Sequence, residues 1–185
     1  MRTTRHVYIV LTDTGTLFTR IIRQFTGDPL NHASIAFDAG LEEVYSFGRK
    51  YIHIPWIGGF VKENMYDAFF LNAKCAIYRC TLEEKQVQIM RRTIDFMLQN
   101  RDRYKYHLTG LVALWLNKKT EREDAYFCSS FVARLFELAG QPLLDKPAYW
   151  VKPGDIARSP YVECIFQGTL SEYLHGASST AATLA

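Results

Sequence analysis

Cys128 is the residue best suited to covalent chemistry, because it precedes a run of apolar residues at helical spacing. These residues recur as far as Ala139, and Gly140 supplies a typical helix stop. The pattern predicts a helix over residues 126–140 with Cys128 in its first turn. The free N–H groups and the positive dipole end of a first turn favour a thiolate and offer donors to a developing oxyanion.

Two interpretations of Cys128 follow from this position. Counting back from Ala139 by helical steps places the thiol on the apolar stripe of the helix, so it faces protein rather than solvent. Free cysteine is among the most buried residue types, and the first interpretation is a structural core thiol. The second is a nucleophile, which requires a base within reach and a third group that orients the base.

Among the five histidines, His32 has the context that best suits such a base. Residues 32–38 alternate as a strand, with His32, Ser34 and Ala36 on one face. Small side chains on that face allow a helix to approach closely and leave the imidazole room for a partner. The other histidines are expected to be surface or satisfied core residues: His6, His53, His107 and His175.

The chain turns back after the histidine strand. Residues 43–48 return antiparallel to the histidine strand, which predicts a hairpin with His32 at its mouth. Glu43, Tyr45 and Phe47 lie on one face of the returning strand.

The rest of the sequence predicts an α+β chain. Further strands are expected at residues 6–12, 68–71, 74–81 and 161–167. Further helices are expected at residues 17–25, from a capping box at 81–84 to about 99, and at 104–116. Residues 49–64 lack a clean period and predict a long loop or lid, and residues 142–160 predict an irregular segment.

Composition predicts one globular domain. A chain of 185 residues with 48% hydrophobic and 22% charged residues is long enough for one substantial core. We expect a single domain over residues 1–175. The small polar residues of the segment 176–185 predict a flexible C-terminal tail.

Net charge, cysteine spacing and hydropathy exclude several classes of partner and of cellular location. The net charge of +3 is mild and the basic residues are scattered, so no nucleic-acid partner is expected. The four cysteines form no Cys-x-x-Cys pair, so neither a zinc ribbon nor a thioredoxin motif is expected, and chemistry at a cysteine nucleophile needs neither a metal nor a cofactor. We find no apolar run of membrane-spanning length and no secretion signal, which together predict a cytoplasmic protein.

Three segments, taken in order, resemble the permuted NlpC/P60 cysteine hydrolases. They are residues 31–37 (NHASIAF), 44–49 (VYSFGR) and 126–132 (YFCSSFV). In this papain-like family, of the YiiX/YebB type, the histidine strand precedes the cysteine helix. The resemblance extends from about Val7 to Ile156. It implies a permuted papain-like fold, in which an antiparallel sheet or partial barrel packs against the helix that carries the cysteine.

The resemblance also assigns roles to the candidate residues. It implies that Cys128 is the nucleophile, that His32 is the base, and that N–H groups at the helix start form an oxyanion hole. Family members place a polar third residue on the strand after the histidine, at a position that Tyr45 occupies here. Tyrosine cannot supply the charge of a carboxylate, so Glu43, two residues earlier on the same face, remains a substitute that the family pattern does not indicate.

The expected function is that of a cysteine hydrolase, an amidase or peptidase acting through an acyl-enzyme on a small peptide or acyl substrate. Aromatic residues around Tyr51, Trp56, Tyr149 and Trp150 are candidates for the pocket lining or for the core. Three alternatives stay open. They are an acyltransferase acting on lipid-like acyl groups, a non-catalytic ligand-binding module on the same fold, and a structural protein with a core cysteine.

Overall fold

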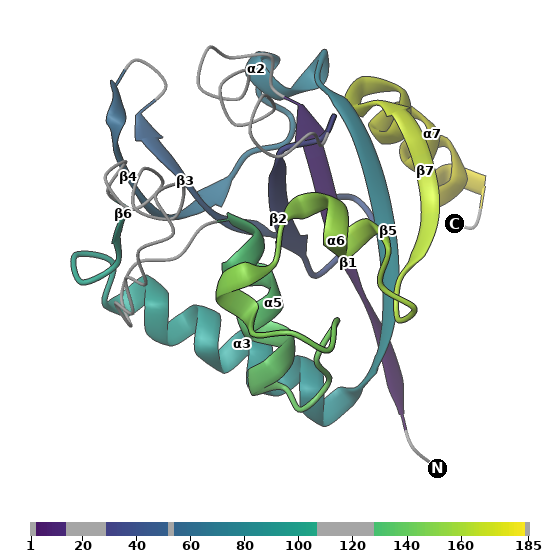
Figure 1. Cartoon of the computed structure of the whole chain (residues 1–185). Coiled ribbons are helices and arrows are strands. Elements are labelled where there is room, and N and C mark those ends of the chain that lie inside the picture. The colour runs from purple at the N-terminus through teal and green to yellow at the C-terminus, as the bar shows by residue number, and fades with distance from the viewer. Residues whose placement is uncertain (1–2, 14–28, 52–53, 107–127, 184–185) are drawn as a thin grey trace.

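A seven-stranded antiparallel sheet forms the centre of the computed structural model, which describes residues 3–13, 29–51, 54–106 and 128–183 (Figure 1). The strand order is β6-β4-β3-β2-β1-β5-β7. The strands are β1 (Thr4–Asp13), β2 (His32–Ala36), β3 (Val44–Tyr51), β4 (Ile54–Glu63), β5 (Lys74–Glu83), β6 (Lys105–Tyr106) and β7 (Glu163–Thr169). The predicted α+β class with an antiparallel sheet is therefore confirmed.

Helices cover both faces of this sheet. They are α2 (Ala68–Leu71), α3 (Glu84–Gln99), α5 (Cys128–Leu138), the 3₁₀ turn η1 (Ala148–Trp150), α6 (Pro153–Ala157) and α7 (Leu170–Thr183). The predicted cysteine helix is confirmed as α5, and Cys128 is its first residue. The helix ends at Leu138, two residues before the predicted stop at Gly140, whose φ of 76° lets the N–H of Gln141 reach back to the carbonyl of Phe136.

Alternation along the strands produces two apolar layers. Ala33 and Ile35 of β2 face α3 and α5, while Ala36 lies in the layer that faces α2 and α7. Phe131 of α5 enters the first layer, with ring centroids 5.2 Å from Phe47 of β3 and 5.6 Å from Phe60 of β4. This aromatic packing holds α5 across the middle of the sheet, so the first residue of the helix lies over the start of β2.

The predicted loop or lid at residues 49–64 is wrong wherever the structure describes it. The segment instead forms a hairpin, in which Gly48 pairs with Gly59 and Arg49 with Gly58, with a register shift between Arg49 and Tyr51. Glycines in both strands and the irregular register remove the alternating pattern that would have identified the strands. His53 lies outside the described residues.

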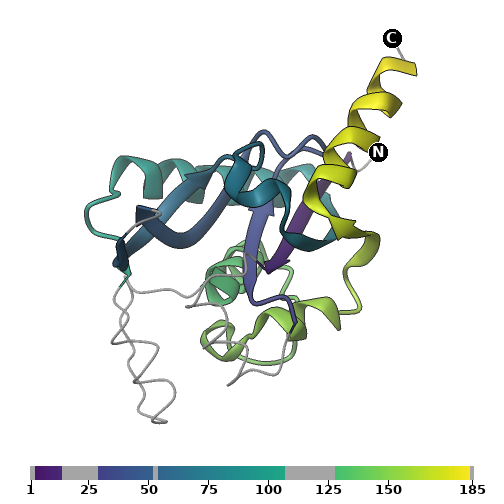
Figure 2. The same cartoon turned by 90° about the horizontal axis from the view of Figure 1, so that it is seen from above.

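Several other boundaries differ from the prediction. Residues 68–71 form helix α2 rather than a strand, because the carboxylate of Asp67 accepts the N–H of Phe69 and caps a helical turn. Residues 176–183 of the predicted tail belong to helix α7, which extends away from the sheet (Figure 2). The predicted helix at 104–116 is wrong at its start, where residues 105–106 form strand β6, and its remainder lies outside the described residues, as does the predicted helix at 17–25.

Within the described ranges, no helix combines the length and hydrophobicity that a membrane crossing requires.

The packing of α5 yields a stability prediction. Replacing Phe131 by alanine removes a fully buried ring and should lower the free energy of unfolding by about 3–5 kcal/mol. Urea denaturation measures this loss. The matched control is Leu138→Ala on the same helix, whose side chain is 45% exposed and should change stability by less than about 0.5 kcal/mol. Equal losses in the two variants would contradict the packing described here.

Candidate active site

Cys128 begins α5 at the point where this helix meets the first residues of β2. Its side chain is half-buried, and its Sγ lies 4.0 Å from the carbonyl oxygen of Asn31. The backbone N–H groups of Ala33 and Ser129 are hydrogen-bond donors to the sulfur. The Ser129 hydroxyl donates to the carbonyl of Val151 at 2.6 Å, which ties the first turn of α5 to the segment after η1. The thiol is therefore held in a fixed position with donors beside it.

His32 is the first residue of β2 and a hydrogen-bond partner of the Cys128 thiol. Its side chain is only 15% exposed. The imidazole Nε2 lies 2.8 Å from Oε1 of Glu63, so Nδ1 is the nitrogen left to face the sulfur. The pair expected from the sequence, Cys128 and His32, is thus brought together by the structure.

Glu63, the last residue of β4, occupies the third position of the set. Its side chain is 7% exposed and accepts three hydrogen bonds. Besides His32, the donors are the hydroxyl of Ser34, at 2.5 Å from Oε2, and the hydroxyl of Ser46, at 2.8 Å from Oε1. The thiol of Cys128, the imidazole of His32 and the carboxylate of Glu63 thus follow one another in space. This arrangement is typical of an activated thiol.

The pKa shifts of the three groups reinforce one another. Burial lowers the pKa of His32, but the charge of Glu63 and hydrogen bonds with Cys128 and Glu63 raise it well above its ordinary value. Burial raises the pKa of the Cys128 thiol, but the hydrogen bond and charge of His32, with two backbone N–H groups, bring it below its ordinary value. Burial raises the pKa of Glu63, but His32 and the two serine hydroxyls bring it down overall. These directions favour a thiolate, an imidazolium and a carboxylate together.

The two orienting residues expected from the sequence, Tyr45 and Glu43, do not serve that role. Tyr45 pairs with Ile35 across β2 and β3, so its side chain lies on the α5 face, opposite to the face of Ser34 and Glu63. Burial, and then the charge of Glu43, raise the pKa of its phenol. Glu43 binds the guanidinium of Arg91 at 2.7 and 2.8 Å. Both candidates therefore belong to the contact between β3 and α3.

The role of Glu63 was not predicted from the sequence because residues 54–63 lack the alternating pattern of a strand. Glu63 lies within residues 49–64, where no face could be assigned to a side chain. Glu63 pairs with Val44 of β3, so their side chains lie on the same face of the sheet. Ser46 lies two residues after Val44 and therefore shares that face. A correct assignment of the strand at 54–63, together with this register, would have placed the carboxylate on the face of Ser34 and His32.

Gly48 lies against the residues of the site. A Cβ added at this residue would lie 3.7 Å from Cε1 of His32, 3.5 Å from Oε1 of Glu63 and 3.3 Å from Oγ of Ser46. The last distance is tighter than an ordinary van der Waals contact, so a side chain here must displace part of the set. The backbone of β3 therefore forms one wall of the site.

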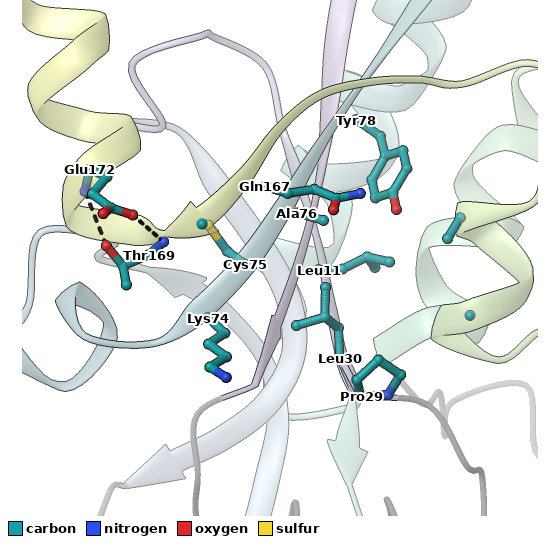
Figure 3. Close-up of a pocket in the computed structure, with 13 residues that line it drawn as sticks. Leu11, Pro29, Leu30, Lys74, Cys75, Ala76, Tyr78, Gln167, Thr169 and Glu172 are labelled. Carbon is teal, nitrogen blue, oxygen red and sulfur yellow. Dashed lines mark hydrogen bonds between the residues drawn. The ribbon is translucent and has the colours of Figure 1, made fainter.

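An apolar pocket of about 500 Å³ is lined by residues of β1, β5, β7 and α6 and by the segment before β2 (Figure 3). Leu30 precedes Asn31, and Leu11 pairs with Ala33, so two of its wall residues are direct neighbours of the backbone around the Cys128 sulfur. The lining residues are Leu11, Pro29, Leu30, Lys74, Cys75, Ala76, Tyr78, Gly154, Ala157, Gln167, Gly168, Thr169 and Glu172. The pocket extends from β1 across β5 to β7, under α6. The sequence-predicted aromatics Tyr149 and Trp150 do not line it and are partly exposed on η1. The side chains of Tyr51 and Trp56 lie outside the described part of the structure.

In the part of the chain that the structure describes, no group of three or more His, Cys, Asp or Glu side chains has the arrangement of a metal site. Comparison of the sequence with models of protein families and with curated proteins gives no match. The function is therefore inferred from the geometry around Cys128.

The close approach of Gly48 predicts an effect on the thiol. The variant Gly48→Val should displace His32 and lower the rate of Cys128 alkylation by iodoacetamide at pH 7 at least about tenfold, since thiolate formation depends on the imidazole. Gly48→Ala should have a smaller effect, because its single methyl group requires a shift of only tenths of an ångström.

The control is Gly40→Ala, where an added Cβ lies at a similar 3.2 Å from Oδ1 of Asp38 but in a turn far along the hairpin from the site. This variant should alkylate like the wild type. Normal alkylation of Gly48→Val protein, with an unchanged fold by circular dichroism, would show that the backbone of β3 does not shape the site.

Proposed function

We propose that the protein is a cysteine hydrolase that cleaves an amide or ester bond through an acyl-enzyme on Cys128. The observation that carries the proposal is that the Cys128 thiol lies beside His32, whose Nε2 is 2.8 Å from the carboxylate of the buried Glu63. A core thiol has no need of such partners, and burial alone would raise its pKa rather than lower it.

The proposed reaction follows from the positions of these groups. The Cys128 thiolate attacks the carbonyl carbon, and N–H groups at the start of α5 stabilise the oxyanion. The C–S bond forms, the bond to the leaving group breaks, and the imidazolium of His32 gives its proton to the leaving amine or alcohol. His32 then takes a proton from water, which attacks the thioester and releases the acid and the thiolate. Glu63 keeps Nε2 protonated and stabilises the imidazolium throughout.

Topology supports a permuted papain-like fold for this chemistry. The strand with the histidine precedes the helix with the cysteine, and that helix packs against an antiparallel sheet. The order and the packing agree with the permuted NlpC/P60 resemblance of the sequence. The carboxylate, however, comes from β4 rather than from the strand immediately after the histidine.

The pocket indicates which part of a substrate lies beside the nucleophile. Its walls near the site are Leu11 and Leu30, so we propose that the acyl side of the substrate carries an apolar group. A small peptide or an acyl ester meets this requirement. Transfer to an amine or alcohol in place of water, as an acyltransferase would perform, uses the same acyl-enzyme and differs only in the acceptor.

The alternative of a non-catalytic binding module rested on the missing charge of a third residue. Glu63 supplies that charge, at 2.8 Å from the histidine. The observation that suggested lost activity therefore no longer holds, and the hydrolase is the function that the site supports best.

Alkylation as a function of pH tests the proposed activation. Wild-type Cys128 should react with iodoacetamide at nearly its full rate well below about pH 8.5, the ordinary thiol pKa, because its own pKa is lowered. The variant Glu63→Gln removes the charge that raises the pKa of His32, so the half-maximal pH of alkylation should rise by about 1–2 units.

The matched control for this measurement is Glu43→Gln. It removes an equivalent carboxylate that binds Arg91 on the other face of β3, and it should leave the profile unchanged. Mass spectrometry after tryptic digestion separates Cys128 from the exposed Cys164. An ordinary thiol profile in wild-type protein would disprove the proposal.

Turnover provides the second test. Wild-type protein should hydrolyse p-nitrophenyl esters and form a mass adduct of the acyl group on Cys128, with esters of apolar acids preferred over acetate. Cys128→Ala should lower kcat/KM at least about 10³-fold, since the nucleophile is lost, whereas Cys164→Ala should have no effect. Equal rates in wild-type and Cys128→Ala protein would show that the activity arises elsewhere.

A further inference from the structure

Two serine hydroxyls surround the carboxylate of Glu63, and each comes from a different strand. Ser34 of β2 donates to Oε2 at 2.5 Å and lies 3.3 Å from Nε2 of His32. Ser46 of β3 donates to Oε1 at 2.8 Å, the same oxygen that receives the histidine. Both serines are completely buried. We call these two hydroxyls the serine clamp.

Apart from Thr12 and the residues of the site, the neighbours of the clamp on its sheet face are apolar. The neighbours on the same face are Val10, Ala36 and Val44, which pack against the layer under α2 and α7. Packing alone is satisfied there by alanine or valine, and a buried hydroxyl is costly unless it is hydrogen-bonded. The presence of two buried serines, both aimed at one carboxylate, therefore requires an explanation beyond packing.

We propose that Ser34 and Ser46 are positioning residues that keep Glu63 ionised and oriented, and thereby hold His32 in place for Cys128. A carboxylate with 7% exposure loses most of its hydration, and burial alone favours its neutral form. The two hydroxyl donors replace the lost water. They also fix the plane of the carboxylate, so that Oε1 stays in line with Nε2 of His32.

The consequence concerns the acid side of the pH profile. As the pH falls, the first proton must go to the carboxylate or to the thiolate. Donors on the carboxylate delay its protonation and so preserve the countercharge of the imidazolium at lower pH. The clamp therefore sets how far below neutrality the thiolate persists, which the proposed function alone does not specify.

The test uses the double variant Ser34→Ala/Ser46→Ala. The half-maximal pH of Cys128 alkylation should rise by at least one unit, and the rate at pH 6 should fall at least about tenfold, with recovery toward the wild-type rate near pH 9. Ser34→Thr, which keeps the hydroxyl, should retain the wild-type profile when introduced alone.

Two controls test whether the loss of any buried hydroxyl would shift the pH profile of Cys128 alkylation in the same way. Thr12 lies opposite His32 across β1 and β2, and within the described structure its buried hydroxyl has no hydrogen-bond partner, so Thr12→Val should leave the profile unchanged. Ser159→Ala removes a buried serine that donates at 2.7 Å to the carbonyl of Leu143, away from the site. It should lower thermal stability without moving the profile.

The inference rests on the proposed catalytic set, so a second measurement is made without the nucleophile. In Cys128→Ala protein with ¹³C-labelled glutamate, the carboxyl resonance of Glu63, assigned by its loss in Glu63→Gln, should titrate below the ordinary glutamate value. Adding the two serine-to-alanine changes should raise that midpoint by at least one unit.

These measurements distinguish two kinds of failure. An unreactive Cys128 combined with a shifted Glu63 midpoint would disprove the hydrolase and leave the clamp intact. An unshifted midpoint in the double variant, or an equal shift in Thr12→Val protein, would overturn the clamp whatever the reactivity of the thiol.

Discussion

The hydrogen bond between His32 and Glu63, 2.8 Å long and nearly closed to solvent, is the interaction on which the site depends. An imidazolium buried without a countercharge would lose its proton, and the thiol beside it would then remain protonated. The carboxylate in turn needs donors, which two serines supply. Each charge in the set is therefore stable only because its neighbour is present, so the effects of single substitutions here are not expected to be additive.

The sheet provides this arrangement by bringing distant residues to one end. The antiparallel ladders place His32 and Ser34 on β2, Ser46 on β3 and Glu63 on β4 within reach of one another. Cys128 approaches from the opposite layer, because the aromatic contacts of Phe131 hold α5 over the start of β2. His32, as the first residue of its strand, is placed where its ring can reach both faces. The site thus spans the two apolar layers rather than lying within one of them.

Local sequence patterns were sufficient to predict the cysteine helix and the histidine strand. Helical periodicity and Gly140 located α5, and alternation with small side chains identified His32. The third residue depends on register, which a single strand does not reveal. Tyr45 was favoured by its place in the chain, yet pairing with Ile35 directs its side chain to the other face. Glu63 lies in a strand whose glycines and register shift erase the alternating pattern, so its face became apparent only through its pairing with Val44.

The residues of the site come from two distant parts of the chain, so the site depends on the complete fold. One meander of three neighbouring strands, within residues 32–63, carries His32, Glu63 and both hydroxyls of the serine clamp. The thiol joins them from residue 128, a contact of long range in sequence. Such contacts form late when local pairing is available first. The thiol of Cys128 has a lowered pKa only where the imidazole of His32 lies beside it, so this property depends on the docking of α5 against β2.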